Sequence, residues 1–270
     1  MVVELLVILI DLAFTVGMTL LIPTGNYYHY WAPFLLLIAG YIVGVGLMWL
    51  ILGIYCKKYK KDKEYTKPSK VANFWLYQSI GFINHHGGAR VKISYNEPMP
   101  KERFLIVCNH ISKFDPMILA EKYGHLGLSF ISKPTNFKIP IGGHLMKGAC
   151  YLSIDRYDKL KSLEVMNKAI DLIKNDYCSI GVFPEGTRGD NPHHMGEFHE
   201  GVFMIATKTN SPIVVTTISD SQNIHKNFPK RCTKVQLRIL KVIYPNEYQG
   251  KTLKQISDYC YQIMEESIKE

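Results

Sequence analysis

The sequence predicts an α/β domain that is preceded by a two-helix membrane anchor. The first 55 positions are apolar and contain no Lys or Arg, so all 32 basic residues lie in 56–270. In that second region, short apolar runs of strand length alternate with segments of helical periodicity, which is the pattern of layered α/β domains. The 47% apolar content suffices for a sizeable core. We therefore divide the chain into an anchor, residues 1–63, and a domain, residues 64–270.

The second half of the anchor reads as a membrane-spanning helix. Residues 34–55 are 22 consecutive residues without a charge. At about 1.5 Å of rise per residue, a helix of this length crosses a hydrocarbon core of about 30 Å. Gly40 and Gly44 form a G-x-x-x-G pattern, which favours close packing against another helix. Five lysines follow within 56–63 and indicate the cytoplasmic side of a cell membrane or another membrane.

Residues 1–22 form a second apolar segment, with Asp11 near its middle. A carboxylate is costly in a membrane, so this segment either spans the bilayer or lies in its interface. It does not read as a signal peptide, because it lacks a basic start and a small-residue cleavage site before Pro23. If both segments span, both chain termini face the cytoplasm.

The charge and the cysteine content of the chain favour some classes of partner and argue against others. Residues 56–270 carry 21 of the 23 acidic residues and a formal charge of +11, which favours polyanionic partners such as anionic lipids or phosphorylated molecules. The basic residues form no stripe with aromatics, so no nucleic-acid partner is expected. Six dispersed cysteines without a C-x-x-C pair indicate neither a disulfide scaffold nor a zinc ribbon, and no metal site is expected.

The elements of the domain follow from periodicity and turn residues. We expect strands at 90–95, 103–108, 128–132, 178–183, 212–218 and 234–243, and helices at 69–84, 116–123, 159–175, 202–209 and 253–268. The helix at 69–84 is amphipathic and rich in aromatics, so it either rests on a bilayer or packs in the core.

The first polar cluster after an apolar strand contains His110 and Asp115. Histidine is the commonest general base, and a carboxylate partner sets its tautomer. Five positions on a helix correspond to about 140° of rotation, so a turn must bring the two side chains together. Asp115 as the N-cap and Pro116 as the first helical residue would supply it. The alternative is that Asp115 only caps the helix.

Two further clusters follow strand-like runs. Residues 183–189 read F-P-E-G-T-R-G, in which glycines let backbone N–H groups approach an anion and arginine can fork onto phosphate. No G-K-[ST] follows, so this is not a Walker loop. Residues 153–156 read S-I-D-R, and their alternative interpretation is a surface ion pair.

Together these motifs resemble the glycerolipid acyltransferases, which acylate lysophosphatidic acid or glycerol 3-phosphate. N-H-I-S-K-F-D at 109–115 and F-P-E-G-T-R at 183–188 carry the resemblance, with I-D-R between them and P-I-V after. It covers roughly residues 85–245. It implies a mixed-sheet α/β acyltransferase domain for residues 64–270.

The resemblance also implies roles for particular residues. His110 would be the general base and Asp115 its orienting partner. The residues that would hold the acceptor, chiefly its phosphate, are Lys133, Arg156, Glu185, Gly186, Thr187 and Arg188. The expected reaction moves a fatty acyl group from a thioester, acyl-CoA or acyl carrier protein, to the sn-2 hydroxyl of 1-acyl-glycerol 3-phosphate. Another lysophospholipid or glycerol 3-phosphate is the alternative acceptor.

A thioester is already activated, so neither a metal nor a bound cofactor is expected. Cys108 is interpreted as structural, because no cation or helix N-terminus is assigned beside it. A Ser/His lipid hydrolase would need a G-x-S-x-G elbow, which the chain lacks. The remaining alternative is a basic lipid-binding membrane protein without catalysis.

Overall fold

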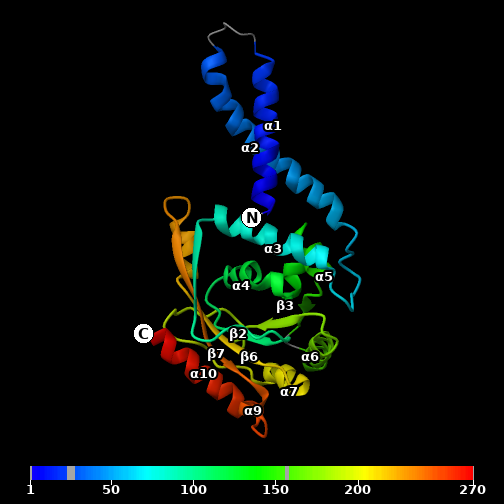
Figure 1. Cartoon of the computed structure of the whole chain (residues 1–270). Helices are drawn as coiled ribbons and strands as arrows, with labels where there is room; N and C mark the ends of the chain where they lie inside the picture. Colours follow the sequence, from blue (N-terminus) through cyan, green and yellow to red (C-terminus); the bar gives the residue numbers. More distant parts are fainter. Residues whose placement is uncertain (1, 23–27, 156–157, 270) are drawn as a thin grey trace. The chain divides into compact units, whose positions relative to one another are not determined.

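The computed structural model describes residues 2–22, 28–155 and 158–269. The chain divides into two compact units, Met1–Lys60 and Lys61–Glu270. The first unit holds helix α1 (Val2–Leu20) and helix α2 (Tyr28–Cys56). Both contain stretches that are long and apolar enough to cross a membrane, Val2–Leu20 and Trp31–Cys56. These two helices are drawn in blue in Figure 1.

The two helices of the first unit pack closely where the G-x-x-x-G pattern falls. A Cβ placed on Gly44 would lie 3.2 Å from the backbone oxygen of Val7, and one on Gly40 would overlap the side chain of Asp11. Asp11 itself accepts a hydrogen bond from the Thr15 hydroxyl at 3.3 Å. The small residues therefore let α2 approach the polar position of α1.

The second unit is built on one mixed sheet of seven strands, with the order β1-β7-β6-β2-β5-β3-β4. Neighbouring strands are parallel except for β6 and β7, which are antiparallel. The strands are β1 (Ala89–Tyr95), β2 (Leu105–Cys108), β3 (Leu128–Ser132), β4 (Leu152–Ser153), β5 (Ser179–Val182), β6 (Ile213–Ser219) and β7 (Thr233–Ile243). The prediction of an α/β domain with a mixed sheet is confirmed.

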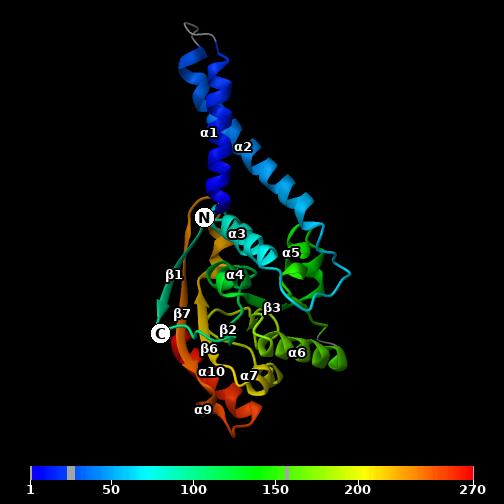
Figure 2. The same ribbon diagram turned by 45° about the vertical axis from the view of Figure 1, so that its right-hand side comes forward.

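Helices cover both faces of this sheet (Figures 1 and 2). On one face lie α3 (Lys70–His86), α4 (Asp115–Tyr123) and α5 (Gly142–Gly148), and on the other lie α6 (Lys159–Lys174), α7 (Met204–Thr209) and α10 (Leu253–Lys269). The shorter helices are α8 (Ile224–Asn227) and α9 (Pro245–Tyr248), with the 3₁₀ turns η1 (Gly124–Leu126), η2 (Pro134–Lys138), η3 (Glu200–Phe203) and η4 (Ser221–Asn223).

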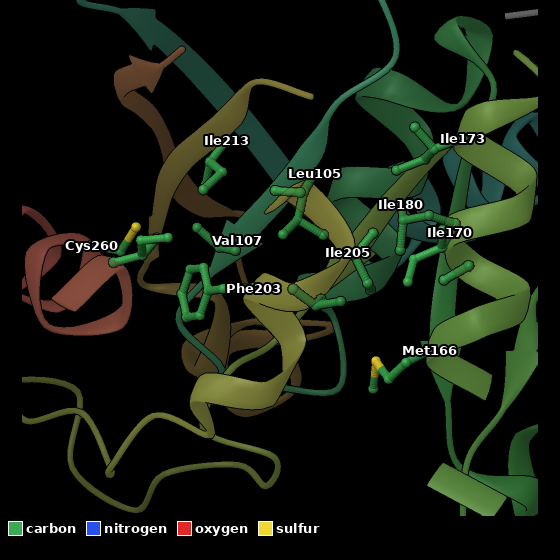
Figure 3. Close-up of a cluster of buried hydrophobic side chains, with 14 of the residues drawn as sticks. Leu105, Val107, Met166, Ile170, Ile173, Ile180, Phe203, Ile205, Ile213 and Cys260 are labelled. Carbon is green, nitrogen blue, oxygen red and sulfur yellow. The ribbon is translucent and has the colours of Figure 1, made fainter. Parts of the chain in front are cut away.

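The larger core lies between the sheet and α6, α7 and α10. Leu105 and Val107 of β2 contribute to it, and Ile106 between them is equally buried on the opposite face. Figure 3 shows Leu105 and Val107 beside side chains from the neighbouring strands and helices. Because both faces of β2 and β5 are covered, every residue of these two strands is buried, as their short, mostly apolar runs predicted.

Helix α3 packs on the domain with one face, as one of the two interpretations of the aromatic-rich segment predicted, while Val71 and Ile83 on this helix remain exposed. Ser69 caps it by accepting a hydrogen bond from the Ala72 N–H at 3.3 Å. Ala72, Leu76 and Phe82 are buried. The predicted helix 69–84 ends two residues before the observed C-terminus of α3. Helix α5 and strand β4 were not predicted. Both are short, and β4 has only two residues, so they carry little periodicity.

Candidate active site

His110 and Asp115 meet at the carboxyl end of β2. The Nδ1 atom of His110 lies 2.9 Å from Oδ2 of Asp115, the first residue of α4. The Asp115 side chain is completely buried, whereas that of His110 is 16% exposed. In the neutral imidazole this contact places the proton on Nδ1, toward the carboxylate, so Nε2 is the nitrogen that can accept a proton. The predicted proximity of the two residues is therefore present.

The way Asp115 reaches His110 differs from the prediction. Helix α4 begins at Asp115 itself, and the preceding N-cap residue, Phe114, makes no side-chain capping bond. The carboxylate turns back instead, and its Oδ2 accepts the backbone N–H groups of Ile111 and Ser112, both at 2.7 Å. The expected N-cap role is wrong, because the side chain closes the 110–115 turn rather than the helix start.

The imidazole of His110 is held on one side by an aromatic ring. It stacks on Phe183 with ring centroids 4.3 Å apart and an interplanar angle of 28°. Within the described residues, Nε2 of His110 has no hydrogen-bond partner. The ring therefore has a fixed plane, one nitrogen bonded to Asp115, and one nitrogen available to a substrate.

Glu185 ties the second polar cluster to the histidine loop. Its Oε1 accepts the backbone N–H of His110 at 2.6 Å, and its Oε2 accepts the N–H of Gly196 at 3.0 Å. Burial raises the pKa of this carboxyl, and this effect exceeds that of the two backbone hydrogen bonds, which act to lower the pKa. The carboxylate thus connects the loops after β2 and β5 and fixes the backbone of His110.

Sheet order gathers the predicted residues at one edge. The strands β2, β5, β3 and β4 are adjacent and parallel, so their carboxyl ends share an edge of the sheet. His110 follows β2, the loop with Thr187 and Arg188 follows β5, and Lys133 follows β3. Residues Thr187, Arg188 and Lys133 are exposed, and among the described residues neither cation has an ion-pair partner.

Two details complete this edge. Gly186 has a positive φ of 71°, and its N–H donates to the Phe183 carbonyl at 3.0 Å, which forms the turn that precedes Thr187. Arg156, which was predicted to face the acceptor, lies outside the described residues. The strand that precedes it, β4, ends at Ser153 beside β3.

Two polar residues that received no role from the sequence support the pair. Ser221, the first residue of η4, is fully buried and donates its hydroxyl to Oδ1 of Asp115 at 2.5 Å. Asn109 bonds the backbone of Ile218 in β6 in both directions, through Oδ1 at 2.8 Å and Nδ2 at 3.0 Å. The sequence signal that pointed to Ser221 was the polar run at 219–223, directly after an apolar strand.

Cys108 is not a nucleophile in this arrangement. It is fully buried, and burial together with the carboxylates of Asp115 and Glu185 raises the pKa of its thiol well above the usual range. Among the described residues, no group of three His, Cys, Asp or Glu side chains is placed to hold a metal ion.

One pocket lies away from these residues. It is a cavity of about 360 Å³ between α6, the residues around β4 and residues 64–66. Neither His110 nor Asp115 lines it.

Comparison with known proteins identifies the family of the chain. The Acyltransferase family model matches residues 90–219. A probable 1-acyl-sn-glycerol-3-phosphate acyltransferase of Mycoplasma pneumoniae is 30% identical over 193 residues, which cover 68% of this chain and 69% of the relative. The 1-acyl-sn-glycerol-3-phosphate acyltransferase of Saccharomyces cerevisiae is 23% identical over 186 residues, which cover 67% of this chain and 59% of that protein.

A solved structure shares the fold. The crystal structure of the 1-acyl-sn-glycerophosphate (LPA) acyltransferase PlsC from Thermotoga maritima matches with a TM-score of 0.56 at 22% identity, covering 81% of this chain and 94% of that one. The chain belongs to the acyltransferase family, as its motifs predicted. It is accordingly an O-acyltransferase, and its family membership favours this class over the alternative of a non-catalytic lipid-binding protein.

Proposed function

We propose that this protein transfers a fatty acyl group from an acyl thioester to the sn-2 hydroxyl of 1-acyl-glycerol 3-phosphate and forms phosphatidic acid. The observation that carries the proposal is the bond between His110 Nδ1 and the buried carboxylate of Asp115, with Nε2 open to a substrate. The names of the two relatives support the acceptor. Acyl-CoA and acyl carrier protein are the two candidate donors.

The proposed chemistry needs one base and no covalent enzyme intermediate. Nε2 of His110 removes the proton of the acceptor hydroxyl as its oxygen attacks the thioester carbonyl carbon. Asp115 stabilises the imidazolium that forms. The tetrahedral intermediate then collapses, the C–S bond breaks, and the leaving thiolate takes the proton from the imidazolium. Base catalysis of this kind contributes about 10²–10⁴-fold.

The proposed acceptor site is the carboxyl edge beside His110. A phosphomonoester carries nearly two negative charges at neutral pH. The exposed cations Arg188 and Lys133, which have no ion-pair partner among the described residues, follow neighbouring strands there. Arg156 is proposed as a third cation, and Thr187 and the Gly186 turn as further contacts. Glu185 contributes indirectly, because both of its oxygens bond backbone N–H groups.

The proposed location is a membrane, with the catalytic domain on its cytoplasmic face. Two apolar helices of spanning length and the five lysines after them support this orientation. A cysteine placed in a tag after residue 270 should be labelled by an impermeant thiol reagent only after cells are opened. Labelling in intact cells would contradict it.

The activity test uses the full chain purified in detergent. Labelled acyl-CoA and acyl carrier protein are each offered with lysophosphatidic acid, glycerol 3-phosphate, lysophosphatidylcholine and a monoacylglycerol. We expect fastest transfer to lysophosphatidic acid and loss of transfer in a folded His110→Ala variant. Preference for the uncharged acceptor would overturn the acceptor proposal, and normal turnover by His110→Ala would overturn the base.

A further inference from the structure

We propose that Ser221 is a positioning residue for catalysis, which acts on His110 through the carboxylate of Asp115. This inference rests on the proposed role of His110 as the base. The observation behind it is a buried chain of hydrogen bonds from the Ser221 hydroxyl to Asp115 Oδ1, and from Asp115 Oδ2 to His110 Nδ1. Ser221 belongs to none of the motifs that led to the site.

The two oxygens of Asp115 are held from opposite sides. Oδ2 accepts from His110 Nδ1 and from the N–H groups of Ile111 and Ser112. Within the described part of the chain, Oδ1 accepts a hydrogen bond from Ser221 alone. A carboxylate rotates easily about its last side-chain bond, so donors on one oxygen alone leave its plane loosely determined. The Ser221 hydroxyl supplies the second point that fixes this plane, and with it the direction of the His110 ring.

Burial makes this contact strong. Both Ser221 and Asp115 are completely inaccessible to solvent, so water does not replace the hydroxyl when it is removed. A hydrogen bond to an ionised acceptor is roughly twice as strong as one between neutral groups, and low polarity strengthens it further.

Ser221 lies opposite Asp115 because the carboxyl ends of β2 and β6 are hydrogen-bonded to each other. Strands β2 and β6 are parallel neighbours, and the side chain of Asn109 after β2 bonds the backbone of Ile218 near the end of β6. Asp220 then takes a left-handed conformation with φ 68°, and η4 begins at Ser221. The reversal turns the serine back toward the start of α4.

Ser221 is a positioning residue rather than a nucleophile. Its proton is donated to Asp115, and Nδ1 of His110 is bonded to the same carboxylate. A serine nucleophile would need the free Nε2 of the histidine as its base. The hydroxyl instead holds the Asp115 carboxylate, which in turn orients the His110 ring.

The test compares Ser221→Ala with a matched loss of a buried hydroxyl. Ser129 is 2% exposed and donates to the Ala149 carbonyl at 2.6 Å, so Ser129→Ala removes a similar bond outside the pair. In the full chain we expect Ser221→Ala to lower kcat about tenfold or more, with the KM of donor and acceptor within about twofold. Ser129→Ala should keep kcat within about twofold of the wild type.

A spectroscopic measurement tests the same contact without turnover. With ring-labelled histidine, the Nδ1 proton signal of His110 is identified by its absence in His110→Ala. We expect Ser221→Ala to shift this signal and Ser129→Ala to leave it in place. An unmoved signal, or a kcat for Ser221→Ala equal to that of Ser129→Ala, would overturn the inference. Full activity of His110→Ala would instead overturn the proposed base, so the two failures are distinguishable.

Discussion

Replacing Asp115 by asparagine separates the charge of this residue from its geometry. The amide oxygen can occupy the place of Oδ2 and accept the donors from His110, Ile111 and Ser112. The amide NH₂ then faces Ser221, whose hydroxyl can turn and accept a hydrogen bond. We therefore expect the His110 ring to keep both its direction and its protonated Nδ1 in the Asp115→Asn variant.

The expected loss of activity follows from the missing charge alone. A hydrogen bond to a charged group contributes about 1.5–3 kcal/mol, compared with about 0.5–1.5 kcal/mol for a neutral one. Replacement of the charged bond by a neutral one therefore removes about 1–1.5 kcal/mol of transition-state stabilisation, which would lower kcat/KM about 5- to 13-fold. In a serine-protease triad, where the same substitution yields the wrong tautomer, the loss is about 10⁴-fold.

The assay is steady-state acyl transfer by the full chain, together with a denaturation curve for each variant. Asp176→Asn is the control, because this exposed carboxylate bonds Arg103 at 2.7 Å and its left-handed backbone accepts asparagine readily. The control should stay within about twofold of the wild type. A 10⁴-fold loss for a folded Asp115→Asn protein would refute retention of the tautomer, and a loss below about threefold would refute the role of the charge.

Three further predictions concern the surroundings of the pair. Arg188→Ala should lower kcat/KM for lysophosphatidic acid by about tenfold or more and change transfer to a monoacylglycerol much less. The control is Lys174→Ala, which removes another exposed cation. An equal loss of kcat/KM for both acceptors would contradict the phosphate contact. Burial raises the pKa of Glu185 above its ordinary value of 4.5, so its contribution to stability is complete below that pH and is lost as the pH rises through the higher pKa of the folded state. Glu185→Gln should flatten this decline in the unfolding free energy above about pH 4.5, and an unchanged slope in denaturation curves would argue against it. A thiol reagent at pH 7 should modify the exposed Cys232 and spare the buried cysteines, and Cys108→Ala should retain transfer activity, whereas its loss would restore the thiol as a candidate nucleophile.

Local pattern determined the elements and the residue types of the site. The uncharged stretch at 34–55 is long enough to require a helix in a membrane, and α2 extends through it. The mostly apolar runs at 103–108 and 178–183 predicted β2 and β5, because strands covered on both faces are rich in apolar residues. His110 and Asp115 stood out because polar groups that end such strands belong to the sheet edge where sites form.

Tertiary structure decided which of these residues meet. Spacing along the chain states nothing about strand order, and the order β6-β2-β5-β3-β4 is what brings the loops after 108, 132 and 182 to one edge. The same order places Ser221 against Asp115 across 106 residues of sequence. The role of a hydroxyl or carboxylate depends on its hydrogen-bond partners and its burial, which the sequence does not state. For this reason Ser221 was not singled out from the sequence. Glu185 was predicted to bind the acceptor, although its carboxylate accepts a hydrogen bond from the backbone N–H of His110.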